Sequence, residues 1–402
     1  MERRRIVVIG SGVAGLTAAY VLRREHDVTL LEADDRLGGH AHTHDVPTGA
    51  VDSGFIVHND QTYPLLTRLF AELGVETRES DMSMSVSCSG CGLEYAGGRK
   101  LPGLFARRRV RLPYLRMLAE VPRFHRMARQ ALTSGDDGTL GEFATRFTPH
   151  FGAHFLTPLV SAVWSCAPAT ARRYPARYLF AFLGNHGMLS VGGAPRWRTV
   201  RGGARSYVER IAKQLTSVRT GCPARELRRS GDGVELLVGE ERHRFHSAVV
   251  ATHPDQALRL LAHPAPAERE VLGAFTYSRN EAVLHTDASV LPAARQAHAS
   301  WNLRMDCRST DPSRVRVSYD MNRLQGQPYL VSLGEQIDER HTVARMVYEH
   351  PACTPESVAA QRLLPSLDDD RIVFAGAYHG WGFHEDGCRS GLRAAQRLGG
   401  HW

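Results

Sequence analysis

The stretch that decides the fold is RIVVIGSGVAG, Arg5–Gly15, in which the apolar run Arg5–Ile9 leads into a G-x-G-x-x-G motif. The apolar run predicts a buried strand, and Leu16–His26 predicts a helix that the glycines open. Asp27–Ala33 predicts a second strand, in which Glu32 stands 17 residues after Gly15. The glycine motif therefore lies in a strand–helix–strand unit, the context that makes it specific.

Each glycine of the motif has a physical task in this unit. Gly10 permits the tight turn, Gly12 lets the backbone approach a pyrophosphate, and Gly15 lets the helix pack closely on the strand. The helix N-terminus offers unpaired N–H groups and positive potential to a phosphate. Glu32 is expected to accept hydrogen bonds from a ribose, and its charge disfavours the 2′-phosphate of NADP.

Length and composition narrow the class of protein. With 402 residues the chain can form two or three structural domains. The sequence has no unbroken apolar run of about 18 residues, so a membrane-spanning helix is not expected. Seven cysteines, an odd number scattered over a long chain, favour a reducing compartment, and we expect a cytoplasmic protein.

The basic residues are almost all arginines, since Lys100 and Lys213 are the only lysines. Within Arg99–Arg129, arginines alternate with apolar residues: Arg107, Arg108, Arg109 and Arg111 with Leu104, Phe105, Leu112, Tyr114, Leu115 and Leu118. This mixture suits peripheral contact with an anionic membrane or an entry port for an amphiphile. The alternative is a solvated helix face with a buried stripe. No nucleic-acid-binding motif accompanies the charge, so nucleic acid is not expected as a partner.

The order of predicted elements indicates an α/β protein with two discontinuous domains. A Rossmann-like, mostly parallel three-layer domain is expected from residues 1–80, 193–256 and 357–402, and a mixed α+β substrate domain from 81–192 and 257–356. The nucleotide domain should contain a helix over Tyr63–Leu73, a helix from Arg201-Gly202-Gly203 to Leu215, and buried strands at Ala248–Ala251 and Arg371–Gly376. Its terminal helix should begin near Asp386.

The motifs come in the order seen in one superfamily. After the first glycine motif follow Asp35-Arg36-Leu37-Gly38-Gly39, Arg201-Gly202-Gly203, Val249-Val250-Ala251 and the block from Phe374-Ala375-Gly376 to Gly391. Over nearly its whole length the chain resembles the FAD-dependent amine oxidase and phytoene desaturase superfamily. Gly39–Thr43 and Gly380–Gly387 look like bacterial predicted NAD/FAD-binding proteins encoded beside cyclopropane-fatty-acid-synthase-like methyltransferases, which implies such a methyltransferase as a partner.

The resemblance implies an FAD site assembled from both ends of the chain. It places Gly10, Gly12, Val13, Ala14, Gly15, Gly38, Gly39 and His40 around the diphosphate, Glu32 and Ala33 at the adenosine ribose, and Ala224 with Cys222-Pro223 at the adenine. It places Gly54 and Phe55 beneath the flavin ring, and Gly376, Ala377, Glu385, Asp386 and Gly387 around the ribityl chain and the pyrimidine. A helix N-terminus near Gly387 also suits negative charge on reduced flavin.

Two residues depart from the superfamily pattern. His40 stands where the superfamily usually has an arginine, so the charge partner of the diphosphate is in question. Amine oxidases commonly use a lysine near flavin N5, and neither Lys100 nor Lys213 has a matching context.

The segment Tyr378–Asp386 gathers imidazoles and carboxylates where the flavin should lie. His379, His384 and Glu385 are therefore the candidates for the proton transfer that accompanies hydride removal. The alternative is that His384 and Glu385 hold the loop and the flavin by hydrogen bonds.

Two further patterns could hold a metal, but neither predicts a site. His40, His42 and His44 alternate, but nearby spacing supplies no further ligands. Cys88-Ser89-Gly90-Cys91 is a C-x-x-C without a second pair, so it predicts a loop with two ordinary thiols, or alternatively a redox pair that relays electrons to flavin.

The sequence therefore predicts an FAD-dependent oxidoreductase that moves a hydride from substrate to flavin N5, with a lipid acyl chain as the expected substrate. Three alternatives stay open. They are oxidation of a small amine or amino acid, flavin-dependent double-bond isomerisation, and a non-catalytic lipid-binding role, since the fold also resembles that of Rab escort proteins.

Overall fold

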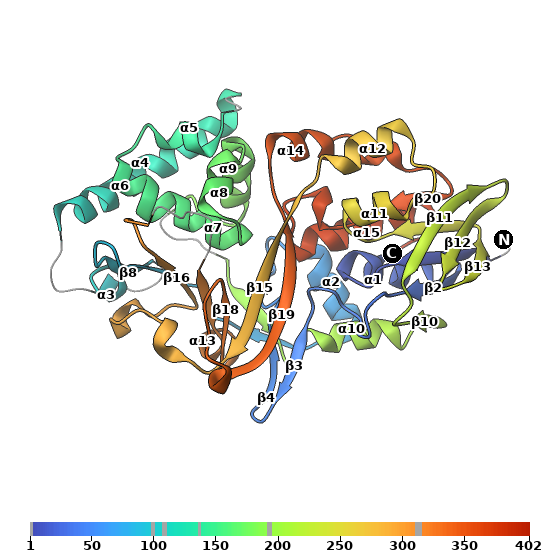
Figure 1. Cartoon of the computed structure of the whole chain (residues 1–402), viewed down its shortest axis with the longest axis horizontal. Helices are drawn as coiled ribbons and strands as arrows, with labels where there is room; N and C mark the ends of the chain where they lie inside the picture. The colour runs from blue at the N-terminus through green and yellow to red at the C-terminus, as the bar shows by residue number, and fades with distance from the viewer. Residues whose placement is uncertain (1–2, 98–100, 107–110, 136–137, 191–194, 310–315) are drawn as a thin grey trace.

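The computed structural model describes the chain except residues 1–2, 98–100, 107–110, 136–137, 191–194 and 310–315. Arg99, Lys100 and Arg107–Arg109, part of the predicted basic segment, lie outside the described residues. Two lobes lie side by side along the long axis (Figure 1). Both chain ends lie on the lobe at the right of that view, which we call the nucleotide lobe.

A five-stranded parallel sheet, in the order β10-β2-β1-β14-β20, forms the centre of the nucleotide lobe. Its strands are β10 (Ser217–Arg219), β2 (Asp27–Leu31), β1 (Arg5–Ile9), β14 (Ser247–Val250) and β20 (Ile372–Phe374). The predicted strand–helix–strand unit is confirmed, because β1 and β2 pair in parallel and flank α1 (Val13–Leu22). The α/β class predicted from the sequence is confirmed.

Apolar residues fill both faces of this sheet, so the lobe has three layers. One face packs against α1, α2 (Pro64–Leu73), α10 (Arg205–Ala212) and α15 (His384–Arg397). The other face packs against an antiparallel meander and helices: β11 (Ala224–Ser230), β12 (Gly233–Val238), β13 (Glu241–Phe245), α11 (Pro254–Leu260), α12 (Pro266–Gly273) and α14 (Pro355–Gln361).

One boundary differs from the expected division. Val271, Leu272 and Phe275 pack in the same core as the meander of the nucleotide lobe. Residues 257–275 therefore pack with the nucleotide lobe and not with the second lobe.

The second lobe is built on a seven-stranded mixed sheet in the order β19-β15-β18-β17-β16-β7-β8. Its strands are β7 (Met84–Cys88), β8 (Glu94–Gly97), β15 (Tyr277–His285), β16 (Trp301–Met305), β17 (Val317–Asp320), β18 (Leu330–Leu333) and β19 (Thr342–Pro351). Only the β7–β16 pair is parallel among the pairs of this sheet. The helices of this lobe are α3 (Leu101–Leu104), α4 (Leu112–Ser134), α5 (Leu140–Ala144), α6 (Pro149–Phe151), a π-helical turn (Gly152–Leu156), α7 (Thr157–Trp164), α8 (Pro168–Arg173), α9 (Ala176–Asn185) and α13 (Met321–Gln325).

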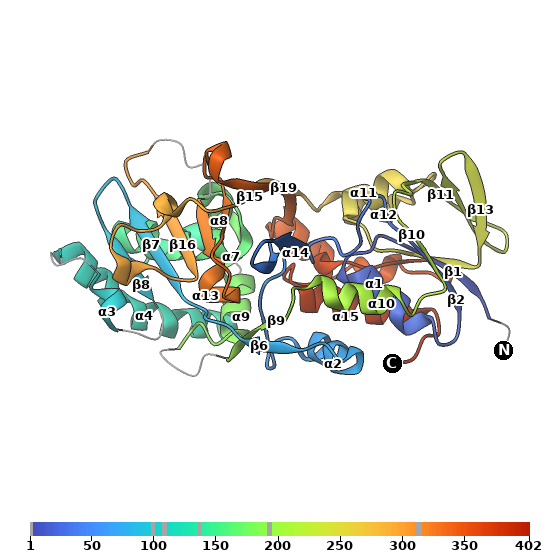
Figure 2. The same cartoon turned by 90° about the horizontal axis from the view of Figure 1, so that it is seen from below.

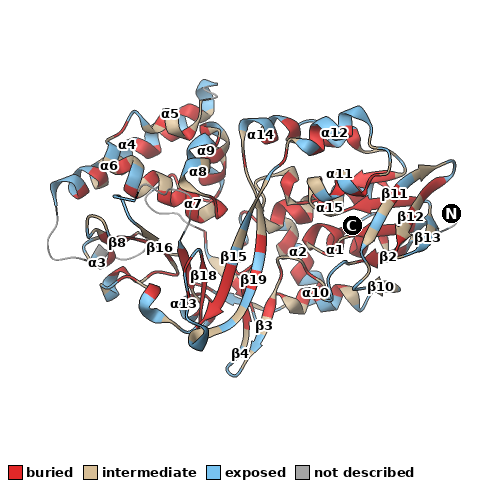
Figure 3. Cartoon of the chain, in the orientation of Figure 1, coloured by how far each residue is buried: buried red, intermediate tan, exposed pale blue. Residues whose placement is uncertain are grey.

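Short pairings join the two lobes. β3 (Thr43–Val46) pairs with β4 (Gly49–Asp52), and β9 (Trp197–Val200) pairs with both β5 (His58–Asn59) and β6 (Thr77–Glu79). The long strands β15 and β19 run between the lobes, as both views show (Figures 1 and 2). Buried residues concentrate within each lobe and along this junction (Figure 3). No helix of the described residues is long and apolar enough to cross a membrane.

Candidate functional site

The turn between β1 and α1 leaves an open space in front of a helix N-terminus. Gly10 has φ +100°, and a Cβ on it would lie 2.7 Å from the Ala251 carbonyl oxygen, so glycine is required there. By contrast, a Cβ on Gly12 would meet nothing within 4 Å. Since no side chain caps α1, its N–H groups face this space and suit an anionic diphosphate.

The second glycine turn lies against the first. Gly38 donates its backbone N–H to the Ser11 carbonyl oxygen (3.1 Å), and a Cβ on Gly39 would lie 3.2 Å from Gly12 Cα. His40 follows this turn, and burial, the largest cause, holds its pKa well below the ordinary value. The imidazole is therefore neutral near pH 7, and it cannot supply a positive charge to the diphosphate.

Arg36 is a residue that the sequence analysis did not single out as a ligand. Its Nη1 is buried and has no hydrogen-bond partner within the part of the chain that the structure describes. Its charge contributes to the lowered pKa of His40, His42 and His44, which shows that it lies near them. Arg36 can therefore provide the cationic partner that His40 does not, and only the tertiary structure shows this.

Glu32 is held beside the glycine turn. Its Oε2 accepts hydrogen bonds from the backbone N–H (2.8 Å) and the hydroxyl (2.5 Å) of Ser11. Cys222 donates its backbone N–H to the Glu32 carbonyl oxygen (2.8 Å), which brings the start of β11 at Ala224 alongside. The predicted ribose and adenine residues therefore lie together, and Ala33 follows Glu32 directly.

The predicted flavin-side residues also converge. Phe55 donates its backbone N–H to the His40 carbonyl oxygen (2.7 Å), and a Cβ on Gly54 would lie 2.1 Å from that oxygen. The Phe55 ring stacks on His384, with centroids 3.8 Å apart. Burial, the larger cause, and His58 lower the pKa of His384 to about 3, and its Nε2 is buried without a partner.

The C-terminal block reaches the same place from the other end of the chain. Gly376 donates its N–H to Ser390 Oγ (2.9 Å), which fixes the turn through Ala377 against α15. Asp386 accepts the N–H of Phe383 (3.0 Å) and so caps α15. A Cβ on Gly387 would lie 2.5 Å from Val13 Cγ1. The N-termini of α1 and α15 are thus adjacent, as the sequence-based hypothesis required.

Glu385 makes the kind of hydrogen bonds that the sequence left open as the alternative to its predicted catalytic role. Its two carboxylate oxygens accept the backbone N–H groups of Leu65 (3.1 Å) and Leu66 (3.0 Å), so it caps α2. Arg389 lies 3.5 Å from the same carboxylate. Burial, the largest cause, raises the pKa of this carboxyl group, and the N–H groups of α2 and Arg389 oppose that rise.

His379 lies apart from His384, in a cavity of about 320 Å³ between α9 and α15. We call this the α15 cavity; its lining includes Tyr178, His379, Trp381, Asp386, Arg389 and Arg393. Burial, followed by Arg393, lowers the pKa of His379 to about 4, and its Nε2 is buried without a partner.

The alternating histidines are divided between two sets of contacts. His42 Nδ1 lies 3.0 Å from the Tyr348 hydroxyl, and His44 Nε2 lies 2.8 Å from Ser53 Oγ. His40 instead contacts the rings of Tyr348 and His350. The His42 and His44 rings lie 4.1 Å apart and His40 shares Tyr348 with His42, but among the described residues these three imidazoles do not form a group that could hold a metal ion.

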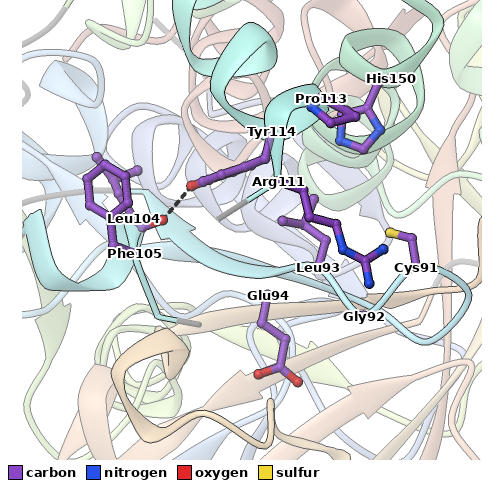
Figure 4. Close-up of a pocket in the computed structure, with 10 residues that line it drawn as sticks. All are labelled: Cys91, Gly92, Leu93, Glu94, Leu104, Phe105, Arg111, Pro113, Tyr114 and His150. Carbon is purple, nitrogen blue, oxygen red and sulfur yellow. Dashed lines mark hydrogen bonds between the residues drawn. The ribbon is translucent and has the colours of Figure 1, made fainter. Parts of the chain in front are cut away.

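A second cavity, of about 190 Å³, lies in the second lobe between the β7–β8 turn, α3 and the start of α4, and Figure 4 shows its lining residues. We call it the α4 cavity; its lining is Cys91, Gly92, Leu93, Glu94, Leu104, Phe105, Arg111, Pro113, Tyr114 and His150. The Tyr114 hydroxyl donates to the Leu104 carbonyl oxygen (2.5 Å), which joins α4 to α3. Around it, Phe105, Leu112 and Leu115 are 47%, 60% and 46% exposed.

The residues present fit FAD. The open space before Gly12 can receive a diphosphate, and the nitrogens of Arg36, His40 and His384 that have no partner among the described residues could bind a cofactor. Lys213, the only lysine among the described residues, is exposed at the end of α10, far from Gly54 and Phe55 in the chain and outside their contacts.

Comparisons with known proteins agree with this fit. The model of the family described as flavin containing amine oxidoreductase matches residues 13–332 and 339–399. AofH of Mycobacterium tuberculosis, named as a flavin-containing monoamine oxidase, is 28% identical over 279 residues, which are 66% of this chain and 61% of that protein.

Two solved structures show the same fold. A double mutant of putrescine oxidase superposes with a TM-score of 0.70 at 15% identity, covering 98% of this chain and 99% of that one. A CLA-producing fatty acid isomerase from P. acnes superposes with a TM-score of 0.69 at 14% identity, again covering 98% and 99%. The chain therefore belongs to the flavin-containing amine oxidoreductase family, whose cofactor is FAD.

Proposed function

We propose that this protein is an FAD-dependent oxidoreductase that oxidises the acyl chain of an anionic amphiphile. When bound, FAD supplies the hydride acceptor at flavin N5. The chain would lose a hydride to that acceptor and a proton, from the neighbouring carbon, to water, and a double bond would form.

The observation that carries this proposal is the charge of the two cavities. The α15 cavity contains Arg393 and also Arg389, which lies 3.5 Å from Glu385, and its carboxylate, Asp386, accepts a backbone N–H at the start of α15. The α4 cavity contains Arg111, and its carboxylate, Glu94, accepts the N–H groups of Ala293 and Ala294. The guanidinium groups of Arg111 and Arg393 suit a carboxylate or phosphate and oppose an ammonium group.

The surface beside the α4 cavity supports an amphiphile in particular. Large exposed side chains at Phe105, Leu112 and Leu115 gather where α3 and α4 meet, next to Arg111. An apolar surface with arginine at its edge is suited to the boundary between lipid headgroups and acyl chains.

His384 is suited to hold the flavin ring. With a pKa of about 3 the imidazole stays neutral and holds a proton only weakly. Stacking on Phe55 fixes its plane and leaves Nε2 for a hydrogen bond. We therefore assign it a positioning role.

The test is anaerobic mixing of the yellow holoprotein with candidate substrates, followed at the flavin absorbance band. Fatty acids and anionic phospholipid vesicles are compared with putrescine and L-amino acids. We expect bleaching with an anionic amphiphile and a product lacking two hydrogen atoms by mass spectrometry. If only amines or amino acids bleached the flavin, the substrate would be a small amine or amino acid and not an anionic amphiphile. An altered amphiphile of unchanged mass would instead establish isomerisation.

A further inference from the structure

Four potential metal ligands meet in the second lobe, away from the flavin site. Cys88 ends β7, Cys91 lies in the turn to β8, His154 lies in the π-helical turn, and Cys307 follows β16. Their ligand atoms all lie within 4.8 Å of one another. We call this group the Cys3His cluster. The sequence predicted no metal site here, because the two ligands beyond the C-x-x-C are distant in the chain.

Strand pairing brings Cys307 to the C-x-x-C. β7 and β16 run parallel, with Met305 opposite Cys88 in register. The chain then turns so that Cys307 donates its backbone N–H to Cys88 Sγ (3.4 Å). A backbone N–H directed at sulfur stabilises a thiolate, which is the form that binds a metal.

The turn from Cys88 to β8 contains two glycines that allow its backbone to come close to Cys307. A Cβ on Gly90 would lie 2.4 Å from Asp306 Oδ1 and 2.9 Å from Cys307 Sγ. Gly92 has φ +73°, and its N–H donates to the Cys88 carbonyl oxygen (2.9 Å). Both glycines therefore let the loop fold back over its own sulfur atoms.

His154 presents one nitrogen to the cluster and has the other engaged. Its Nε2 lies 3.4 Å from Cys91 Sγ, and its Nδ1 lies 3.2 Å from the His150 carbonyl oxygen. When Nδ1–H donates to that carbonyl, the Nε2 lone pair faces the sulfurs. The Tyr95 hydroxyl donates to the His154 carbonyl oxygen (2.8 Å) and holds this turn in place. In metal sites, a hydrogen bond from the second ring nitrogen, such as the one from Nδ1 of His154, orients the metal-binding histidine.

We propose that the Cys3His cluster binds one zinc ion as a structural site. Three thiolates and one imidazole are a preferred zinc ligand set, and zinc bond lengths put such ligands about 3.5–3.8 Å apart. The Cys91–His154 separation of 3.4 Å lies just below this range. Binding releases the thiol protons and involves no change of oxidation state.

Four protein ligands leave no open coordination position, so this zinc would not take part in the flavin chemistry. It would instead join the β7–β8 turn, the end of β16 and the helical layer. Because Cys91 and His150 line the α4 cavity, the zinc would also hold one wall of that cavity.

The first experiment measures metal in wild-type holoprotein, prepared without chelators, by elemental mass spectrometry. We expect about one zinc per chain. Replacement of the zinc with cobalt should add thiolate–cobalt bands in the red, beyond the flavin absorbance. A metal-free protein, or a disulfide between Cys88 and Cys91 under reducing preparation, would overturn the proposal.

Variants locate the ion. Cys307→Ser changes an exposed position, so folding should be preserved while zinc retained after dialysis against a chelator falls at least tenfold. His154→Cys should keep zinc and change the cobalt spectrum to that of four thiolates. Ser89→Ala, an exposed position between Cys88 and Cys91 that is not one of the four ligands, is the matched control and should keep the zinc and the cobalt spectrum. Flavin content should be unchanged in all three, which separates this test from that of the redox proposal. Equal zinc retention in Cys307→Ser and wild type would refute the assignment.

Discussion

Gly387 in α15 faces Val13 in α1 so closely that a Cβ at position 387 would lie 2.5 Å from the valine Cγ1 atom. One turn further along, a Cβ on Gly391 would lie 2.1 Å from the Ala14 carbonyl oxygen. The two helices thus touch through backbone, and this contact brings both positive helix ends to one place.

Replacing Gly391 with alanine should separate these helices. Because the obstructing atom is backbone oxygen, we expect the free energy of unfolding to fall by about 1–3 kcal/mol and FAD affinity to fall with it. Urea unfolding and flavin titration measure the two effects. Gly273→Ala, in α12 with open space around it, is the control and should be neutral or slightly stabilising. Equal stability of the two variants would mean that α1 and α15 are not in contact.

The Gly12→Ala substitution should weaken FAD binding and leave the stability of the apoprotein nearly unchanged. The position has φ −62° and an added Cβ meets no protein atom, so unfolding of the apoprotein should change by no more than about 1 kcal/mol. The same methyl group would occupy the space proposed for the diphosphate. We expect purified Gly12→Ala to be colourless and its FAD affinity to fall at least tenfold, measured by fluorescence titration. A yellow variant with wild-type affinity would place the diphosphate elsewhere.

Asp52 should make stability depend on pH. It is buried and accepts hydrogen bonds from Thr43, Ala204 and Gln325. Burial, the largest cause, raises its pKa from 3.8 to about 6. The folded state therefore binds this proton more tightly than the unfolded state, and stability falls as pH rises from about 4 to 6, by at most about 3 kcal/mol.

Asp52→Asn removes that dependence, so the slope of unfolding free energy between pH 4 and 6 should become smaller. Denaturant unfolding at several pH values measures it. Asp368 and Asp386, whose pKa values are also raised to about 6, keep part of the slope in the variant. An unchanged slope would show that Asp52 is ionised at pH 5 in the folded protein.

Glu385→Gln tests the capping role of this carboxylate. Glutamine retains one acceptor but turns an amide toward the N-terminus of α2, so we expect a loss of about 1–2 kcal/mol in unfolding free energy. Flavin reduction by the substrate should continue. Glu270→Gln, exposed in α12, is the control. Loss of flavin reduction at unchanged stability would return Glu385 to the catalytic role expected from the sequence.

The surface at α4 should bind anionic vesicles through its apolar residues. The double substitution Leu112→Ser and Leu115→Ser keeps the charge and should weaken vesicle binding at least tenfold, since burying a leucine contributes about 1.5–3 kcal/mol. Val343→Ser with Val347→Ser is the matched control, because these side chains are 44% and 49% exposed on β19. Co-sedimentation measures both. If the two double variants bound vesicles equally well, this face of α4 would be an ordinary solvated helix face, which is the alternative that the sequence left open.

The sequence predicted those features that local chemistry determines. The glycines from Gly10 to Gly15 act through turns and a helix end within a few residues, and α1, α2 and α15 were all expected. The Cys3His cluster was missed because it depends on the register between β7 and β16 and on a turn of the helical layer. The capping of α2 by Glu385 was missed for the same reason, since the two groups are 320 residues apart.

Thr17 and Cys388, which touch across the α1–α15 contact, are separated by 371 residues. During synthesis on the ribosome, the apolar face of α1 that packs against α15 therefore stays uncovered until α15 has been synthesised. The FAD site is therefore complete only after the C-terminal helix has been synthesised. FAD can bind to the complete site only late in the maturation of this protein.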